Sequence, residues 1–334
     1  MNKKVLVLGS TGAMGQYLVP YLADMGYKIT AVSLGDEKPY NENVTCIKRN
    51  AKDFDFLKSL MSEGFDGVVD FMIYNQRDFI NYYKLFLDNT KHYIFLSSCR
   101  VYANEEVPIK ETSPRLLDVS TDEKLLASND YCIHKAKAEN ILMLSDYDNW
   151  TIVRPATTFS KMRYQLVTLE ATNTVGRAKR GKKVVLPVQA KNTPATLCWA
   201  GDVSMMIAKL LFNEEAKREI FNVCSAEHRT WEEIAEYYRN ITGLESVWVD
   251  KEDYLEILSP ELALGTRWQL EYARMFDRIT DNSKVLKLTG MKQEELTSLY
   301  DALKMMIDAV PEGYEFKENE LDKRMDAYIE NHNL

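Results

Sequence analysis

Short apolar runs alternate with amphipathic stretches along the first half of the chain. The runs are rich in Val, Ile and aromatic residues, which is typical of β-strands. They occupy residues 4–9, 28–34, 67–73, 92–98 and 150–156. Parallel strands buried on both faces read as continuous apolar runs, as these do. The pattern therefore predicts an α/β fold, a doubly wound parallel sheet with crossover helices on both faces.

The second half of the chain is less regular. Residues 176–187 predict the end of a helix followed by a short strand, and residues 218–225 predict another strand. Residues 229–243 predict a helix, because Thr230 and Glu233 have the spacing of a capping box and Gly243 follows the last apolar position.

Composition and charge narrow the class of protein. The chain has 334 residues, 46% hydrophobic and 28% charged, which is typical of a soluble globular protein with one large or two interlocked domains. No apolar stretch is long enough to cross a bilayer and the N-terminus lacks the pattern of a signal peptide, so we expect no membrane association and a cytoplasmic location. The net charge of −8 argues against nucleic acid as a partner. Five scattered cysteines with no Cys-x-x-Cys pair indicate neither disulfides nor a metal site.

Three glycines follow the first predicted strand at three-residue spacing. Gly9, Gly12 and Gly15 stand between that strand and an amphipathic helix. Glycine allows a tight turn and a close approach to a pyrophosphate, whose charge then faces the positive end of the helix. In this strand-turn-helix context the spacing predicts a dinucleotide site.

The end of the second predicted strand bears on the choice of dinucleotide. A carboxylate there would bind the ribose diol of NAD, and an arginine would accept the extra phosphate of NADP. Ser33 and Leu34 occupy the discriminating positions, with Asp36 and Lys38 slightly later. The missing arginine favours NAD, while Lys38 leaves NADP open.

A tyrosine and a lysine four residues apart indicate acid–base chemistry. Tyr131 and Lys135 lie on one face of a predicted helix, where an ammonium stabilises a phenolate. Ser98, at the end of a strand, would orient the oxygen whose proton moves. Tyr300 and Lys304 have the same spacing but follow no glycine turn or serine strand, so we interpret them as an ordinary amphipathic helix.

In these motifs the chain resembles the extended short-chain dehydrogenase/reductase family, in particular its NAD-dependent epimerase/dehydratase group, which acts on nucleotide sugars. The matching segments run in family order over nearly the whole chain: "GSTGAMG" (9–15), "SSCRVY" (97–102), "YCIHK" (131–135), "TIVRPATTF" (151–159), "AGDVSMMIAKLL" (200–211), "IFNVCSAEHRTWEEIA" (220–235) and "DNSKVLKLTG" (281–290).

The resemblance implies a Rossmann-type sheet with a smaller interleaved α/β substrate-binding lobe. It assigns residues 1–157 to the dinucleotide-binding domain, to which 196–224 return, and 158–195 and 225–334 to the lobe. By match, Ser98, Tyr131 and Lys135 are catalytic, and Ser98 and Thr157 contact the substrate. The implied cofactor-binding residues are Gly9, Thr11, Gly12, Ala13, Met14, Gly15, Ser33, Asn50, Phe71, Tyr131, Lys135, Pro155 and Thr158. A nucleotide-sugar substrate and a homodimer are also implied.

Departures from the family pattern restrict the reaction. Cys99 and Arg100 stand where the dehydratases carry an acidic pair, so 4,6-dehydration is disfavoured and reversible hydride transfer, by an epimerase or an oxidoreductase, is favoured. Thr157 replaces an asparagine that often contacts the substrate, and residues 70–75 ("DFMIYN") replace the usual small residues. These departures are similar to those of epimerase-like proteins that include chloroplast stem-loop binding relatives. A cofactor-binding regulatory or RNA-associated protein without turnover is therefore the alternative.

Several polar residues have structural interpretations. We expect His92 and His134 to be structural, since neither has a metal partner at a useful spacing. The basic run 177–183 could meet a diphosphate or be a solvated helix end. Arg100 could reach an anionic substrate, although pairing with a surface carboxylate is favoured.

Overall fold

The computed structural model describes residues 3–334, which divide into two compact units. The first unit runs to Thr158 and adds Ala200–Ser225 and Thr280–Leu296. The second comprises Phe159–Trp199, Ala226–Ile279 and Thr297–Leu334. No helix within residues 3–334 has the length and apolar character needed to span a membrane.

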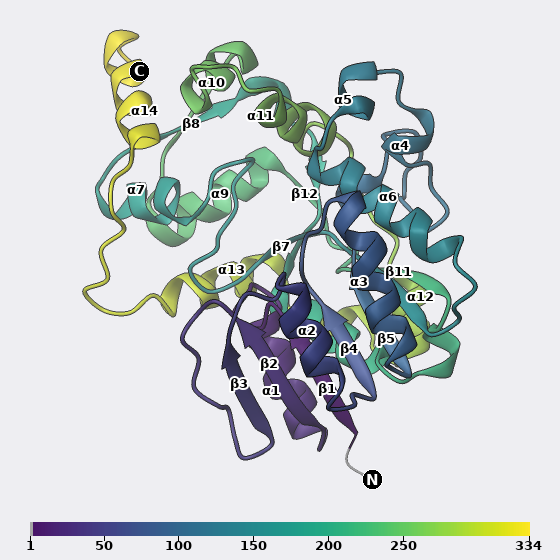
Figure 1. The fold of residues 1–334 in the computed structure, drawn as a ribbon. Helices are drawn as coiled ribbons and strands as arrows, with labels where there is room; N and C mark the ends of the chain where they lie inside the picture. The colour runs from purple at the N-terminus through teal and green to yellow at the C-terminus, as the bar shows by residue number, and fades with distance from the viewer. Residues whose placement is uncertain (1–2) are drawn as a thin grey trace. The chain divides into compact units, whose positions relative to one another are not determined.

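Within residues 3–334, a seven-stranded sheet forms the centre of the first unit (Figure 1). Its order is β11-β6-β5-β4-β1-β2-β3, and every neighbouring pair runs parallel. The strands are β1 (Lys4–Leu8), β2 (Lys28–Ser33), β3 (Val44–Lys48), β4 (Gly67–Asp70), β5 (His92–Leu96), β6 (Trp150–Pro155) and β11 (Glu219–Val223). The predicted doubly wound parallel sheet is confirmed.

Helices cover both faces of this sheet. Helices α2, α3 and α6 pack in one layer, and α1, α8 and α12 pack in the other (Figure 1). The helices of this unit are α1 (Gly15–Asp24), α2 (Phe54–Met61), α3 (Gln76–Asp88), α4 (Leu116–Val119), α5 (Glu123–Ala127), α6 (Tyr131–Met143), α8 (Ala200–Leu210) and α12 (Ser283–Thr289), with short 3-10 turns η1 (Cys99–Val101), η4 (Glu214–Ala216) and η6 (Gln293–Glu295).

The second unit combines short strands with helices. Strands β8 (Val184–Pro187) and β13 (Ser246–Val249) pair in parallel, and β9 (Pro194–Ala195) and β12 (Arg229–Thr230) pair antiparallel. Its helices are α7 (Val175–Lys179), α9 (Trp231–Thr242), α10 (Lys251–Leu258), α11 (Leu264–Gln269), a π-helical turn (Leu270–Arg274), α13 (Leu299–Asp308) and α14 (Glu320–Asn331), with 3-10 turns η2 (Ala171–Asn173) and η3 (Val188–Ala190) and strand β10 (Leu197–Trp199). Strand β7 (Thr157–Phe159) lies where the chain leaves the first unit.

Helix α9 begins and ends as its sequence predicts. Thr230 caps it through the Glu233 amide, the Glu233 carboxylate accepts the Thr230 amide at 2.7 Å, and Gly243 has a left-handed φ of 77°. Buried Trp231, Ile234, Ala235 and Tyr238 recur at helical spacing, so one face of α9 is apolar.

Residues 280–296 belong to the first unit, whereas the sequence placed all of 225–334 in the lobe. The reason is a set of contacts that no local pattern contains. The Asn282 amide donates to the Cys224 carbonyl at 2.9 Å, and the Asn222 amide donates to the Asp281 carbonyl at 3.2 Å. Both bonds attach residues 281–282 to β11 and to Cys224, the residue that follows it.

The one strand of the sheet that the sequence analysis missed is β3, whose five residues are only partly buried. An edge strand carries a weak apolar pattern because one side faces solvent. Two predicted strands also end early, at Asp70 and Leu96, because the next residues turn to build the site described below.

Aromatic rings fill the layer between the sheet and the α2–α3–α6 side. Tyr74 stacks on Tyr82 with ring centroids 4.5 Å apart, and Phe86 stacks on Tyr93 at 5.2 Å. Buried tyrosines need a partner for the hydroxyl. The hydroxyls of Tyr74 and Tyr93 both donate to Asp70, at the carboxyl end of β4.

His92 is a buried structural histidine at the start of β5. Its Nδ1 accepts the Phe212 amide at 2.8 Å, and its Nε2 lies 2.8 Å from the Thr151 hydroxyl, which donates to the Ala216 carbonyl. Nε2 therefore carries the proton of a neutral ring. Burial lowers the pKa of His92 to about 4.

We predict that His92 makes stability fall with acidification. Its folded-state pKa lies below the unfolded value, so its contribution is complete above about pH 6.5 and is lost as the pH falls toward 4. Between pH 7 and pH 5, wild type should lose on the order of 2 kcal/mol relative to His92→Gln. Urea unfolding of both proteins at the two pH values measures this. A difference that does not change with pH would show that His92 is not held neutral.

Candidate active site

The crevice in the sheet lies between the carboxyl ends of β1 and β4. The chain runs from β1 outward through β2 and β3, and then from β4 outward in the opposite direction. At such a switch point the two connections leave on opposite faces, which opens a ligand-binding crevice. Gly9 follows β1 and Phe71 follows β4, and the Phe71 amide donates to the Leu8 carbonyl at 3.1 Å.

The glycine turn after β1 has no room for side chains. Gly9 has a φ of 84°, which favours glycine, and a Cβ there would lie 3.2 Å from the Cβ of Phe71. A Cβ on Gly15 would lie 2.4 Å from the Ser10 carbonyl oxygen. Gly12 closes the turn through its amide, which donates to the Gly9 carbonyl at 3.0 Å. The turn is compact enough for a phosphate to reach the backbone at the start of α1.

The other predicted residues of this loop lie around the same turn. Thr11 is exposed, and Ala13 is buried. Met14 is the N-cap residue of α1, and its carbonyl accepts the Ser204 hydroxyl of α8 at 2.9 Å. Helix α1 is thereby fixed to α8, its neighbour in the same layer, and its amino end faces the crevice.

A cavity of about 220 Å³ lies at the ends of β2 and β3. Its lining residues are Ser33, Gly35, Asp36, Glu37, Lys38, Cys46, Ile47 and Lys48. The Ser33 hydroxyl donates to the Gly35 carbonyl at 3.3 Å, and Leu34 is exposed. Lys48 bonds both oxygens of Asp36, at 2.7 and 2.8 Å.

Glu37 is the residue of this cavity that the sequence analysis missed. Its Oε2 accepts the Ser10 hydroxyl at 2.8 Å, which ties the carboxylate to the glycine turn. Glu37 is also close enough to Cys46 to contribute, after burial, to the raised pKa of that thiol. A carboxylate is therefore held where the ribose discriminator is expected, four residues after Ser33.

Two more predicted cofactor residues flank the crevice. Asn50 is exposed after β3, where its Oδ1 accepts the Lys52 amide at 3.0 Å and its carbonyl accepts the Asp53 amide. Phe71 is partly buried against Gly9. Asn50 thus shapes the turn before α2, and Phe71 forms a wall of the crevice.

Tyr131 begins α6, and two cations lie near its ring. Asp130 caps the helix by accepting the Cys132 amide, and the same Oδ1 accepts the Arg100 guanidinium at 3.2 Å. The Arg100 guanidinium lies 5.4 Å from the Tyr131 ring centroid, and the Lys135 ammonium lies 5.8 Å from it. The partner of Arg100 is a carboxylate with 8% exposure, whereas the sequence favoured a surface carboxylate.

Lys135 is buried and fixed by two carbonyl groups. Its Nζ donates to the Met72 carbonyl at 3.0 Å and to the Leu96 carbonyl at 2.5 Å. Burial lowers the pKa of Lys135 to about 8, although Asp70 and Glu139 oppose the shift. The ammonium form therefore dominates at neutral pH.

Ser98 stands two residues beyond Leu96 at the end of β5. It is buried, and its hydroxyl oxygen accepts the Arg100 amide at 3.2 Å at the start of η1. The structure thus brings Ser98, Tyr131 and Lys135 to one edge of the sheet, through the bonds of Lys135 and Arg100. The preceding Ser97 points elsewhere and donates to Glu139 at 2.5 Å.

A buried ionic network holds α6 against the sheet. Arg154 of β6 forms two bonds with the Glu139 carboxylate, at 2.8 and 2.7 Å, and Arg115 adds a third at 3.0 Å. Arg154 also donates to the Tyr102 hydroxyl, which donates to Asn222 of β11. Burial raises the pKa of Glu139, but Arg154, the Ser97 hydroxyl and Arg115 together lower it below its usual value.

The remaining predicted residues follow β6. Pro155 is the last residue of β6 and is buried. Thr157 and Thr158 are partly buried in β7, and the Thr158 hydroxyl donates to the Ala156 carbonyl at 2.9 Å. These residues continue from the carboxyl end of the strand beside β5.

The basic run 177–183 is used internally in the second unit. Arg177 is fully buried and pairs with Asp322 and Asp326 of α14, at 3.3 and 2.5 Å. Arg180 pairs with Asp322 at 3.0 Å, and Lys182 pairs with Asp326 at 3.1 Å. Arg177 is thus an internal ion-pair partner, whereas Lys179, Gly181 and Lys182 are exposed at the end of α7.

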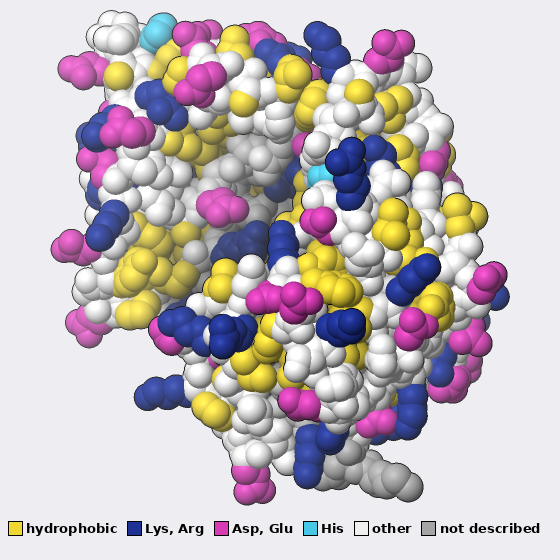
Figure 2. Space-filling view, viewed as in Figure 1, with side chains coloured by type: hydrophobic (Ala, Val, Ile, Leu, Met, Phe, Trp, Pro, Cys, Tyr) yellow, Lys and Arg dark blue, Asp and Glu magenta, His cyan; other side chains and the backbone are white. Residues whose placement is uncertain are grey.

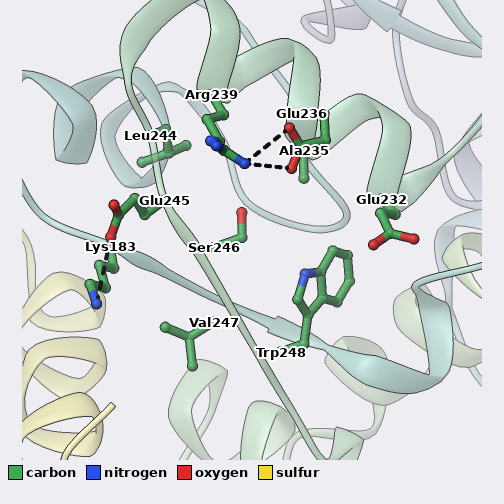
Figure 3. Close-up of a pocket in the computed structure, with 10 residues that line it drawn as sticks. All are labelled: Lys183, Glu232, Ala235, Glu236, Arg239, Leu244, Glu245, Ser246, Val247 and Trp248. Atoms are coloured by element: carbon green, nitrogen blue, oxygen red, sulfur yellow. Dashed lines mark hydrogen bonds and ion pairs between the residues drawn. The ribbon is translucent and has the colours of Figure 1, made fainter.

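A separate cavity of about 280 Å³ lies in the second unit between α9 and β13 (Figure 3). Four of its charged side chains are paired within the wall, Arg239 with Glu236 at 3.2 Å and Lys183 with Glu245 at 3.5 Å, and Glu232 pairs with Lys191 at 3.0 Å. Tyr300 and Lys304, the second Tyr-x-x-x-Lys pair, lie in α13, where Lys304 pairs with Asp308. Among residues 3–334, no group of His, Cys, Asp and Glu could hold a metal ion.

A family model and a curated relative both match the sequence of this chain. Residues 9–184 match the family model described as NAD(P)H-binding. The chain is 27% identical over 255 residues to a chloroplast stem-loop binding protein of 41 kDa from Arabidopsis thaliana. The match covers 70% of this chain but only 62% of that relative, so the chain spans about three fifths of its length.

Solved structures share the fold at low sequence identity. An epimerase from Methanothermobacter thermautotrophicus superposes with a TM-score of 0.71 and 17% identity, covering 92% of this chain and 91% of the other. The enzyme WbmG of Bordetella bronchiseptica, solved with NAD and UDP, gives 0.68 and 18%, covering 92% and 94%. UDP-glucose 4-epimerase from Thermotoga maritima, solved with UDP-glucose, gives 0.66 and 17%, covering 91% and 97%. The chain therefore shares its fold with these three proteins.

We predict that Gly15→Ala weakens NADH binding by at least about tenfold. The new Cβ would meet the Ser10 carbonyl oxygen at 2.4 Å, so the start of α1 must move away from the turn that receives the pyrophosphate. NADH fluorescence titration measures the affinity. Gly265→Ala is the control, because a Cβ there meets nothing within 4 Å. Equal affinities for the two variants would contradict the assignment of the turn.

Proposed function

This chain belongs to the NAD(P)H-binding family, and on that premise we propose that it is an enzyme that transfers a hydride between NAD(P) and a nucleotide sugar, as an epimerase or an oxidoreductase. The observation that carries the proposal is that the Lys135 ammonium and the Arg100 guanidinium lie 5.8 and 5.4 Å from the Tyr131 ring centroid, at the carboxyl edge of the sheet. Perturbed, buried ionisable groups beside a phenol are typical of catalytic sites.

The residues present fit a dinucleotide. A Cβ on Gly9 or Gly15 would fill the turn beside α1, and the cavity at the ends of β2 and β3 has a volume of about 220 Å³. The first feature suits a pyrophosphate and the second suits the adenosine ribose. Lys135 would hold the ribose of the nicotinamide half, and Pro155 and Thr158 would border its ring.

The proposed chemistry divides the work between cofactor and protein. When bound, the nicotinamide ring accepts a hydride from the substrate carbon or returns one to it. The Tyr131 Oη takes the proton of the substrate hydroxyl during oxidation and gives it back during reduction, so that proton and hydride leave together. The Ser98 hydroxyl orients the reacting oxygen, and the Lys135 ammonium favours the phenolate form of Tyr131.

Elimination is not part of the proposal. Cys99 and Arg100 occupy the two positions after Ser98, and Asp130, the carboxylate that caps α6, already accepts the Cys132 amide and Arg100. Dehydration needs an additional acid and base. Several similar structures were solved with UDP sugars or UDP, which supports a nucleotide sugar as the substrate class. Thr157 is the residue we propose for contact with it.

A cofactor-binding, RNA-associated protein is the second candidate, because the curated relative is named for stem-loop binding. The net charge of −8 disfavours it. Figure 2 shows Lys and Arg side chains interspersed with Asp and Glu over the face viewed, rather than one basic surface. Binding of stem-loop RNA below about 1 μM at 0.15 M salt, with no NADH binding, would favour this candidate over the enzyme.

Two further expectations remain proposals. We propose a homodimer formed through helices that include α6, as the family resemblance implies, and a cytoplasmic location. Size-exclusion chromatography with light scattering tests the first.

We predict that Tyr131→Phe keeps NADH affinity within about threefold while turnover falls by about 100-fold or more, because only the proton-transferring oxygen is lost. A screen of nucleotide sugars, with isomer analysis and NADH absorbance as readouts, measures turnover. Tyr300→Phe is the matched control, since it alters the other Tyr-x-x-x-Lys pair. If no nucleotide sugar is turned over, or if both variants keep full activity, the enzyme assignment fails.

We predict that Glu37 makes the protein prefer NADH. Its carboxylate, held by Ser10, can accept a ribose hydroxyl and repels a 2′-phosphate. Glu37→Gln should lower the ratio of the NADPH and NADH dissociation constants about tenfold, or ~1.4 kcal/mol. Glu42→Gln is the control, because Glu42 is exposed in the same loop but does not line the cavity. An unchanged ratio in Glu37→Gln would place the discriminator elsewhere.

A further inference from the structure

Asp70 is a carboxylate buried at the end of β4, with no exposed surface. Its Oδ2 accepts the Tyr93 hydroxyl at 2.8 Å, and its Oδ1 accepts the Met72 amide at 2.9 Å and the Tyr74 hydroxyl at 3.3 Å. Burial raises the pKa of Asp70 to about 6, while these three donors oppose the shift. At neutral pH the group is therefore mostly ionised, and the reaction proposed above gives this buried charge no part.

The Met72 peptide connects Asp70 to Lys135. Its amide donates to Asp70, and its carbonyl accepts the Lys135 ammonium at 3.0 Å. Rotation of this segment would break both bonds at once. The Leu96 carbonyl completes the set of acceptors around Lys135.

Few charges are left to balance Lys135. Asp70 and Glu139 favour its ammonium form, whereas burial and Lys52 oppose it. Glu139 is already bonded by Arg154 and Arg115, so its charge is compensated within α6 and β6. The other titratable groups that interact with Asp70 or Lys135 are the phenols of Tyr74, Tyr82, Tyr93 and Tyr131 and the imidazole of His134. Asp70 is therefore the carboxylate available to compensate the ammonium.

We propose that Asp70 is a positioning residue that, through the Met72 peptide and its own buried charge, keeps the Lys135 ammonium charged and directed to the side of Tyr131. Its effect on turnover rests on the proposed function, whereas its effect on Lys135 rests on the contacts alone. Tyr74 and Tyr93 hold Asp70 in its ionised form by donating to it.

The same contacts account for the unusual sequence of residues 70–75. Asp70 supplies the charge, Met72 supplies the bridging peptide, and Tyr74 supplies a donor that returns from the start of α3. A smaller residue in place of Tyr74 would remove one of the donors to this carboxylate, whereas the Met72 donor is a backbone amide. A buried carboxylate without donors would be neutral at pH 7 and could not balance Lys135.

The direct test is the titration of Lys135 in the protein without cofactor or substrate. In protein labelled at the lysine ε-carbons, the Lys135 NMR signal is assigned by its loss in Lys135→Arg. We expect a wild-type midpoint near pH 8 and, in Asp70→Asn, a midpoint lower by about one pH unit or more, since the compensating charge is removed.

Two milder variants and one control accompany this measurement. Tyr74→Phe and Tyr93→Phe each remove one donor to Asp70, so both should shift the Lys135 midpoint in the same direction by a smaller amount. They cover the case in which Asp70→Asn does not fold. Asp66→Asn is the matched control, because Asp66 lies before the other end of β4 and bonds Lys91 and the Lys4 amide. It should leave the Lys135 midpoint unchanged.

The midpoint and the activity report on separate claims. A folded Asp70→Asn protein, or both Phe variants, with an unchanged Lys135 midpoint would overturn the inference whatever the protein catalyses. If the Lys135 midpoint is shifted in Asp70→Asn but the wild-type protein binds no NADH, the inference is upheld and the proposed function fails. With both intact, the alkaline limit of NADH binding should move with the midpoint.

Discussion

The fully buried carboxylate of Glu139 fastens α6 to the sheet, and the geometry of the site depends on that attachment. Arg154 from β6 and Arg115 from the segment before α4 neutralise it, and Ser97 at the end of β5 donates to it. Removing one partner of such a network leaves a buried charge, which costs about 3–5 kcal/mol. The network therefore sets the height and rotation of α6 relative to the carboxyl ends of β5 and β6.

That attachment explains how a small number of charges can act together at the crevice. Lys135 lies one turn before Glu139 on α6, so its ammonium is carried to the Leu96 and Met72 carbonyls. Tyr131 lies one turn earlier still and meets Arg100. Each cation has a fixed acceptor or carboxylate, so the charges need little rearrangement when a proton moves, and such preorganisation is a main source of rate enhancement in enzymes. In the function proposed above, the cofactor rather than the protein would supply the redox chemistry.

The local features of the fold and of the candidate site could be predicted from sequence. The strands, the glycine turn, the capping box of α9 and the spacing of Tyr131 and Lys135 are all written within short windows of the chain. Apart from the edge strand β3, whose apolar pattern is weak, the features that were missed depend on residues far apart. Glu37 meets Ser10 across 27 residues, and residues 177–183 meet α14 more than 140 residues later.

The basic run shows why charge alone misleads. In the sequence, Arg177 has the pattern of a surface cation. In the fold it is buried and forms ion pairs with Asp322 and Asp326 within the second unit. Similarly, nothing near residue 280 in the sequence reveals that Asn282 returns to the Cys224 carbonyl. Buried polar groups need hydrogen-bond partners, and those partners often come from distant parts of the sequence. They can therefore be identified only from the whole fold.

The central claim is that this crevice holds a nicotinamide dinucleotide as a reactive cofactor. Mass spectrometry of the nucleotide released when the purified protein is denatured tests it most directly, with a second sample incubated with NADH and desalted. The account predicts NAD or NADH in near-equal amount to the protein in at least one sample, retained through purification for an epimerase and exchangeable for a reductase. Absence of any dinucleotide from both samples would contradict it.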